Sequence, residues 1–503
     1  MVFPVSLLSS RVAALLPCPP GPASRRGRRP SRVRARVSAR VRRLVSRCLA
    51  AWLVLWCLAG VQGLASTHRI GPYSVPDPDL HSATMYALAT GQALNPAPYA
   101  ADGHGNMVRR QRLTGDAAYL TGQLEYNRVV TLILEHPLRP DPTLASQHHR
   151  LDRPQGTIHA RAKSTQYTPL AYLPQAIGLR AAWTLGVDGP YRALQCARLA
   201  NLACYLALMT LAIGLAPRGR LLLAILAGLP ANAFLASSIA TDATLMALTA
   251  LIVALTLKAA RDGKPASRAW LAGMCLAAAC LILAKPPYAA CLLLPLALPR
   301  RVLGHGRRTP LLAACVLATL AYLAWSHAWG GGFYDANLRD NLHTAREHPL
   351  GLVWLTIRNL LLLPATTGSP TWPSITGITL TLAAWTAALA RNRRTRTATP
   401  TRTTGPHRYT TAALAAALAT LTATILYLAL TFNDLPAALH TGHILGIQGR
   451  YLTPLLPLLL TTTTTTRHPI KPNTQPTRHD RQTDKKGKLP PDHLREKPPK
   501  PSA

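Results

Sequence analysis

The feature that most constrains this chain is a series of apolar segments, each long enough to cross a lipid bilayer. A helix of roughly 17–25 residues spans a hydrocarbon core of ~30 Å, and runs of that size recur through the 503-residue sequence. Inside lipid, only helices and closed barrels satisfy every backbone hydrogen bond. Because strand-like alternation is absent, we predict an all-α, polytopic helical membrane protein with roughly 10–12 transmembrane helices.

The formal net charge of +37 is concentrated beside the apolar runs. Eleven arginines lie within residues 25–47, directly before the first run, and a second basic stretch, residues 467–500, follows the last. Basic residues that flank spans mark the cytoplasmic side. We therefore interpret the charge as a topology signal with both termini in the cytoplasm, and expect no nucleic-acid partner.

Three regions follow from this pattern. We expect residues 1–47 to be a basic, disordered leader and residues 467–503 a basic, disordered cytoplasmic tail, because both hold too little apolar sequence to bury a core. Residues 48–466 form the membrane domain. Its first span, residues 48–66, delivers residues 67–166 to the outer side as a long loop. A structureless loop of that length is unusual, so we expect it to be folded and to contain helical pieces.

The remaining apolar runs alternate with basic loops, and placing those loops in the cytoplasm yields ten spans. The runs lie at residues 198–216, 220–237, 242–258, 269–285, 287–299, 310–329, 372–390, 410–431 and 450–466. Two further segments are residues 167–185 and residues 351–365. If both crossed the membrane, the loops between them would lie on the side opposite to the one that their charges indicate. We favour interfacial or re-entrant helices for these two.

This topology puts four groups of polar side chains on the outer face. The groups are Asp77, Asp79 and His81 after the first span; Asp242 between two spans; Lys285 with Tyr288; and Gln448, Arg450 and Tyr451 before the last span. Ionisable residues at membrane depth are costly, and such residues are usually functional or paired. We therefore interpret the four groups as one candidate site.

Carboxylates and cations at one depth suit the transfer of a group from a lipid phosphate. A carboxylate can take the proton of an acceptor hydroxyl as a general base, while Lys285 or Arg450 neutralises the leaving phosphate. A divalent metal bridging the carboxylates and a phosphate is compatible with this set. Nothing in the spacing requires a metal, so we assign no metal ligands and leave the cofactor open.

Most members of the set also have a simpler explanation. Asp77 and Asp79 lie among prolines and could form a surface turn, while His81 could begin a helix that continues to residue 92. Asp242 could be the N-cap of the helix that follows it. The long stem of Lys285 could let its amine reach the interface. Arg450 has no such simple explanation, because it stands at the first position of an apolar run.

Six segments, in order, resemble one known family. They are residues 77–81, 167–178, 198–201, 237–242, 285–288 (Lys-Pro-Pro-Tyr) and 448–457 (beginning Gln-Gly-Arg-Tyr). The family is an actinobacteria-rich group of predicted polytopic membrane proteins, catalogued as a domain of unknown function and distantly similar to GT-C glycosyltransferases. The resemblance covers roughly residues 50–465 and leaves both basic ends outside.

The resemblance implies a GT-C-like fold with a long first outer loop and a transferase that uses a polyprenyl-phosphate sugar. An acidic residue in that loop would be the base. The family's first motif usually reads Asp-Glu-Pro-x-His. Asp77 and His81 match its ends, but Pro78 stands at the second acidic position and Asp79 at the usual proline. This departure leaves open which carboxylate matters, with Asp77 slightly preferred.

We therefore predict a multi-pass protein of the bacterial plasma membrane that works at its outer face. Its partners would be the lipid bilayer, a polyprenyl-phosphate-linked sugar and a cell-envelope acceptor. Two alternatives stay open. A transporter or flippase of lipid-linked sugars should carry charges near mid-membrane and internal repeats, and neither is evident. A non-catalytic membrane protein would not depend on the four outer-face groups.

Overall fold

The protein is described from a computed structural model. The structure describes residues 46, 48–75, 77–101, 107–120, 151, 156–163, 168–329, 336–362, 405–431, 433–444, 446–447 and 449–463. Apart from residue 46, the predicted leader lies outside this set, as do the predicted tail and the apolar run at residues 372–390.

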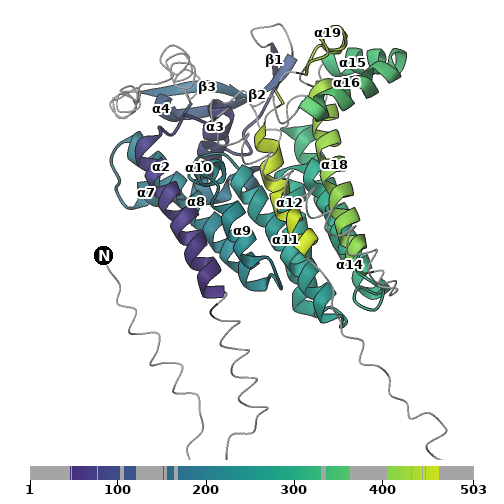
Figure 1. The fold of residues 1–503 in the computed structure, drawn as a ribbon. Helices are drawn as coiled ribbons and strands as arrows, with labels where there is room; N and C mark the ends of the chain where they lie inside the picture. The colour runs from purple at the N-terminus through teal and green to yellow at the C-terminus, as the bar shows by residue number, and fades with distance from the viewer. Residues whose placement is uncertain are drawn as a thin grey trace, which may run out of the picture.

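The fold is a helical membrane bundle, as predicted. Among the described residues, five helices are long and apolar enough to cross a membrane. They are Cys48–Arg69, Pro190–Leu215 (α8), Asp242–Asp262 (α11), Gly306–Ala328 within α14 (His305–Ala328), and Arg408–Thr431 within α18 (Gly405–Thr431). Figure 1 shows them side by side, with the smaller elements gathered above them.

Helix α11 lies at the centre of the bundle. It packs against α8, against the 17-residue helix α12 (Arg268–Ala284) and against the 3₁₀ segment η6 (Gly449–Thr463). Every residue from Leu245 to Leu257 is buried, so the helix is covered on all its faces. A helix that is apolar all round belongs in a core, so α11 is the element around which the others are arranged.

Local sequence signals set the ends of α11 and α12. Gly263, with φ of +64°, ends α11 in the left-handed conformation that glycine adopts without steric cost. Ser267 then caps α12 by accepting a hydrogen bond from the backbone N–H of Trp270. Helix α12 ends at Ala284 because Lys285 precedes a proline and is therefore disfavoured in the helical region. Asp242 and Lys285 thus lie at the same end of the helix pair.

Several apolar runs form shorter elements than predicted. The run at 220–237 is two helices, α9 (Arg220–Ala227) and α10 (Pro230–Ala236), because Gly228 and Pro230 interrupt it. The run at 287–299 falls on the 3₁₀ segment η5 (Pro286–Leu292) and helix α13 (Leu293–Leu296).

The last run also departs from an ordinary α-helix. Segment η6 is a long 3₁₀ helix that contains two prolines, and proline removes the backbone donor that an α-helix needs.

The segment after the first span folds on top of the bundle. It holds helix α3 (Pro78–Ala89), the one-turn helix α4 (Ala117–Leu120) and strands β1 (Tyr99–Ala101), β2 (Met107–Asp116) and β3 (Thr157–Lys163). The strands form an antiparallel sheet in the order β1-β2-β3. The expectation of helical pieces is confirmed in α3, which begins three residues before His81. The three strands were not expected from the sequence and are an addition to the helical fold.

The two segments that did not fit the span pattern are short helices. The first becomes a 3₁₀ turn, η4 (Pro169–Tyr172), followed by α7 (Leu173–Thr184). The second becomes α16 (Pro349–Leu362), which packs with α15 (Ala336–Glu347), α18 and α19 (Leu435–Thr441). At 12 and 14 residues, α7 and α16 are shorter than a typical span.

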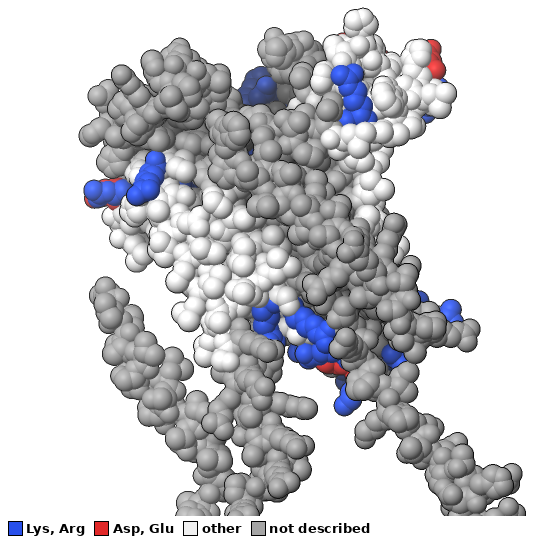
Figure 2. Space-filling view, viewed as in Figure 1, with Lys and Arg blue, Asp and Glu red and all other residues white. Residues whose placement is uncertain are grey.

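The described charges separate along the bundle. The loops that join α8 to α9, α11 to α12 and α13 to α14 contain most of the exposed Lys and Arg at one end of the bundle. They are part of the blue group at the lower end of the white bundle in Figure 2. Asp242 begins α11 and Lys285 follows α12, so both lie at the end opposite the loop that joins these helices. Helix α3 and the sheet lie at that same end (Figure 1). The candidate site is therefore at the end of the bundle opposite the basic loops.

Candidate functional site

Four charged side chains from distant parts of the sequence form one chain of ion pairs. The Arg450 Nη2 lies 2.6 Å from the Asp77 Oδ2, and the Arg450 Nη1 lies 3.6 Å from the Asp242 Oδ2. The Lys285 Nζ lies 3.8 Å from the other carboxylate oxygen of Asp242. Charges alternate along the order Asp77, Arg450, Asp242, Lys285, so the two cations balance the two carboxylates.

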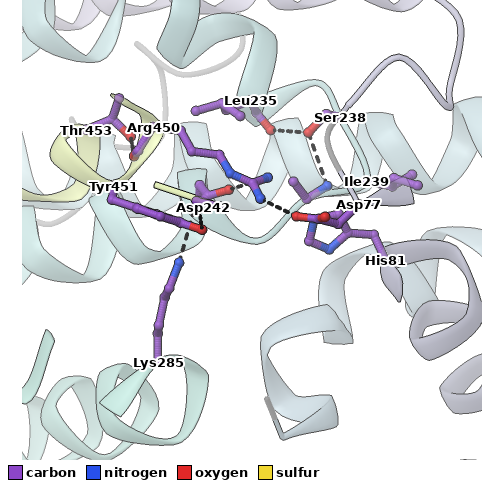
Figure 3. Close-up of polar contacts among 12 residues, drawn as sticks. Asp77, His81, Leu235, Ser238, Ile239, Asp242, Lys285, Arg450, Tyr451 and Thr453 are labelled. Atoms are coloured by element: carbon purple, nitrogen blue, oxygen red, sulfur yellow. Dashed lines mark hydrogen bonds and ion pairs between the residues drawn. The ribbon is translucent and has the colours of Figure 1, made fainter. Parts of the chain in front are cut away.

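The two carboxylates differ in exposure. The Asp242 side chain is 4% exposed and that of Lys285 is 8% exposed, whereas the Asp77 side chain is 54% exposed. Figure 3 shows the guanidinium of Arg450 between them. The 2.6 Å contact to Asp77 is a charge-assisted hydrogen bond, while the contacts of Asp242 are longer than hydrogen bonds. This row of four ion-paired side chains is thus buried at Lys285 and exposed to solvent at Asp77.

Two tyrosines line the buried end of the chain. The Lys285 Nζ lies 4.3 Å from the centre of the Tyr451 ring and 5.8 Å from that of Tyr288, within cation–π range. The Tyr288 hydroxyl donates to the carbonyl of Tyr451 at 2.7 Å. This hydrogen bond ties the element after α12 to the start of η6. It therefore joins the two segments that supply Lys285 and Arg450.

His81 borders the open end of the chain. Its side chain is buried, and its Nδ1 lies 2.9 Å from the hydroxyl of Tyr172. Burial lowers the pKa of His81 from 6.5 to about 4, helped by the positive charge of Arg450. The imidazole is therefore neutral at pH 7. Its other nitrogen, Nε2, has no hydrogen-bond partner among the described residues.

The backbone at Asp77 is strained. Asp77 has φ of +57°, and no other described residue except glycine has positive φ. Aspartate tolerates this conformation better than most residues, but a residue before proline favours extended backbone instead. Pro78 then occupies the first turn of α3, where a missing N–H has no cost. Conformations of this kind cluster at functional sites, where surrounding contacts hold them in place.

A set of buried polar side chains holds the loop before Asp242. The amide nitrogen of Asn201 donates to the carbonyls of Ser238 and Ala240 at 2.9 and 3.1 Å. The amide of Gln175 donates to Ala240 at 3.1 Å. Buried carbonyls need such donors, so these contacts fix the loop that places Asp242 at the start of α11.

Arg198 on α8 extends this support to the first span. Its guanidinium donates to Ser237 at 2.6 Å, to Ile70 at 2.7 Å and to Ser66 at 3.1 Å, in each case to the backbone carbonyl. Ser66 and Ile70 lie at the end of the helix that precedes Asp77. The Ser66 carbonyl also accepts from the backbone N–H of Ile70, while the Ile70 carbonyl lies past the last turn of the helix and cannot be satisfied within it. Arg198 therefore joins the segment before Asp77 to the segment before Asp242.

The structure brings together most of the predicted residues. Asp77, Asp242, Lys285, Arg450 and Tyr451 are in direct contact, and Tyr288 and His81 adjoin them. No ion pair links Asp79 to this chain in the described part of the protein, and Gln448 lies outside the described residues.

Two of the simpler explanations do not hold. Asp242 is the first residue of α11, and Thr241 occupies the N-cap position with no side-chain capping bond. Lys285 is buried against Asp242 and does not extend to the surface.

Four residues of the site were not singled out as candidates: Tyr172, Gln175, Arg198 and Asn201. All four fall in segments that carry the family resemblance. Arg198 also had its own signal, because an arginine inside a long apolar helix is costly unless it is paired. The other three are ordinary polar residues by sequence, and only their contacts identify them.

The two carboxylates face an arginine and do not face each other. Among the described residues, no group of three His, Cys, Asp or Glu side chains is close enough to hold a metal ion. A hard divalent cation prefers several oxygen ligands, and Arg450 occupies the position between the carboxylates. The described residues therefore do not form a metal site by themselves.

Comparison with known proteins identifies a family. The model of a family described as "Predicted membrane protein (DUF2142)" matches residues 61–459. No curated protein and no solved structure matches the chain. The matched range includes all the residues of the charge chain and the three buried side chains that support it.

Proposed function

The chain belongs to the DUF2142 family of predicted membrane proteins, and we propose that it is a membrane transferase. It takes a sugar from a polyprenyl-phosphate carrier and passes it to a cell-envelope acceptor at the outer face of a bacterial plasma membrane. Both termini lie in the cytoplasm. This proposal keeps the GT-C likeness as an analogy of fold and chemistry.

The observation that supports the proposal is the alternating chain of charges at the bundle end opposite the basic loops. Basic loops mark the cytoplasmic side, so the four ion-paired side chains lie toward the outer aqueous phase. Two cations and two carboxylates at one membrane boundary suit a substrate with a lipid tail and an anionic head. A transporter would instead hold its charged site near mid-membrane.

The differing exposure of the carboxylates suggests how the site works. A donor phosphate competes with Asp77 for Arg450, because Asp77 is half exposed and can turn toward water. Asp242 is buried between the two cations and stays in place. Binding of the phosphate therefore frees Asp77 at the position where an acceptor hydroxyl arrives.

The reaction then proceeds in one displacement. The acceptor oxygen forms a bond to the anomeric carbon of the sugar while the bond from that carbon to the phosphate oxygen breaks. The bonding electron pair goes to the phosphate, which Arg450 and Lys285 neutralise. The hydroxyl proton goes to the carboxylate of Asp77. Neutral His81, whose Nδ1 faces Tyr172, orients the reacting groups through its remaining nitrogen.

The test is sugar transfer by the purified full-length protein in lipid nanodiscs. The donor is a radiolabelled polyprenyl-phosphate hexose, and a cell-wall extract supplies the acceptor. We expect Asp77→Asn to lower the rate by about 10²–10⁴-fold, as the loss of a general base does, and Asp79→Asn to change it by less than about twofold. Asp79 is the matched control because it is an acidic neighbour outside the charge chain.

Equal rates in the wild type and both variants would remove these carboxylates from the mechanism. A wild-type protein that transfers nothing, yet moves the labelled lipid across a vesicle membrane, would support the flippase alternative.

A further inference from the structure

Strands β2 and β3 place cations opposite one another. In their antiparallel register Arg112 lies across from Arg161, and Arg110 lies across from Lys163. Residues two apart on a strand share a face, and so do directly opposed residues. Like charges directly opposed in a sheet are destabilising. The stability of the sheet therefore does not explain the pattern.

The cationic face points away from the membrane bundle. The opposite face of β2 carries Leu113, which is buried against Ala83 and Ala87 of α3. Arg112 and Arg161 are exposed. Because side chains alternate across a strand, the arginines project on the side opposite α3. In Figure 1 the sheet lies above α3, on the side far from the spans.

No carboxylate neutralises this face within the described residues. No ion pair reaches Arg110, Arg112 or Arg161 from the described part of the chain. Asp116, at the end of β2, instead accepts a hydrogen bond from the backbone N–H of Ala118 at 2.8 Å. Within the described residues, the charge of the three arginines is therefore available to a partner in the aqueous phase.

We propose that the face formed by Arg110, Arg112 and Arg161 is a docking surface for a linear polyanion. This polymer bears phosphate or carboxylate groups at intervals and approaches from the outer aqueous phase. The inference deepens the proposed function and rests on it for one point, that the polymer is the class of acceptor. Helix α3 connects the two places, since its first turns carry His81 and its later residues pack against the sheet.

The geometry favours a chain of charges over a single anion or a lipid headgroup. Arg110 and Arg112 are about 7 Å apart along the strand, and Arg161 lies beside Arg112 on the neighbouring strand. A planar guanidinium binds phosphate or carboxylate in a two-pronged geometry. Because the surface lies on the far side of the sheet from the spans, a headgroup of the protein's own bilayer is poorly placed to reach it.

The test measures polymer binding without any sugar donor. The full-length protein is held in nanodiscs of phosphatidylcholine, and the probe is fluorescently labelled inorganic polyphosphate, followed by anisotropy. The test variant is R110Q/R112Q/R161Q. The matched control is R180Q/R192Q/R339Q, which removes the same charge from three arginines that are exposed outside the sheet. Thermal unfolding of both variants shows that each remains folded.

We expect the sheet variant to raise the dissociation constant by about tenfold and the control to raise it by less than about twofold. Wild-type binding should weaken as salt screens the charges. Equal losses in both variants would mean unspecific charge attraction and overturn the proposal. Absence of wild-type binding, or binding of the wild type to anionic vesicles alone, would overturn it too.

The two proposals fail separately. Polymer binding without sugar transfer would keep the docking surface and remove the transferase. Sugar transfer to a neutral acceptor without polymer binding would keep the transferase and remove the docking surface.

Discussion

Arg198 and Arg450 are both largely buried cations at the same end of the bundle, yet their surroundings differ completely. Arg198 donates to backbone carbonyls from two segments of the chain. Arg450 faces two carboxylates, Asp77 and Asp242, one of which is half exposed. One arginine is enclosed by the backbone, and the other is paired with side chains.

This difference separates a structural charge from an exchangeable one. A backbone carbonyl cannot leave its partner unless the chain around it moves, so Arg198 stabilises the fold. The carboxylate of Asp77 is half exposed, and in the proposed mechanism it turns toward solvent and leaves Arg450 to an anionic ligand. Arg198 holds together the two segments between which Arg450 acts.

The largest expected effect comes from Arg198→Met. This variant leaves the carbonyls of Ile70 and Ser237 without the donor that Arg198 supplies, and each loss costs about 1–3 kcal/mol. We expect the free energy of unfolding to fall by about 4 kcal/mol. Thermal unfolding in detergent measures it. Arg180→Met, on the exposed face of α7, is the control, and an equal midpoint in both variants would contradict the structural role of Arg198.

The next effect tests the charge balance around Asp242. Asp242→Asn leaves Lys285 and Arg450 with one buried counter-charge fewer, and removing one partner of a buried pair costs about 3 kcal/mol. Adding Lys285→Met should recover part of that loss, because it removes the uncompensated cation. A double-mutant cycle of unfolding midpoints measures the coupling. Strictly additive losses would mean that the pair is not coupled.

A smaller effect concerns pH and His81. Its pKa is about 4 when folded and 6.5 when unfolded, so between these values the unfolded chain binds a proton that the folded protein excludes. Stability should therefore fall as pH drops from 6.5 to 4, by at most about 1.4 kcal/mol per pH unit from this group. Above pH 6.5 it contributes no pH dependence.

The measurement compares unfolding midpoints of the wild type and His81→Gln across this range. The difference between the two should shrink as the pH falls. A constant difference would show that His81 takes up its proton equally in both states.

The smallest effect extends the comparison to the sheet, where arginines face each other without a carboxylate among the described residues. Arg161→Thr removes the like-charge opposition with Arg112 and should raise the free energy of unfolding by about 0.2–1 kcal/mol. Lys264→Thr, in the loop between α11 and α12, is the control for charge alone. Destabilisation by Arg161→Thr would mean that the arginine is partnered.

Much of the candidate site could be predicted because charged residues stand out in apolar sequence. Asp242, Lys285 and Arg450 each adjoin an apolar run, and the alternation of basic loops assigned them to one side. The supporting residues could not be predicted in the same way. Gln175 and Asn201 look like ordinary polar residues, and their role depends on which carbonyls of a distant loop they meet.

The division of the apolar run at 220–237 into two helices was harder to predict. Gly228 and Pro230 are known helix breakers, but hydropathy averaged over many residues does not separate the apolar residues before them from those after them. The sheet was missed because four of the ten residues of β2 are arginine or glutamine. Its buried and exposed positions therefore do not alternate between apolar and polar residue types. Leu113 is buried against α3, and Gln111 is buried against the loop that follows α3. Both contacts depend on the tertiary structure.

The sequence by itself determined that this is a helical membrane protein with charged residues gathered at one face. Inside lipid the backbone must satisfy its hydrogen bonds internally, and charged side chains are costly there. The tertiary structure decided which charges meet. Asp77 and Arg450 are separated by 373 positions in the chain, and no local pattern encodes their contact. It also selected Asp77 over Asp79, because a left-handed turn before Pro78 directs the former toward Arg450.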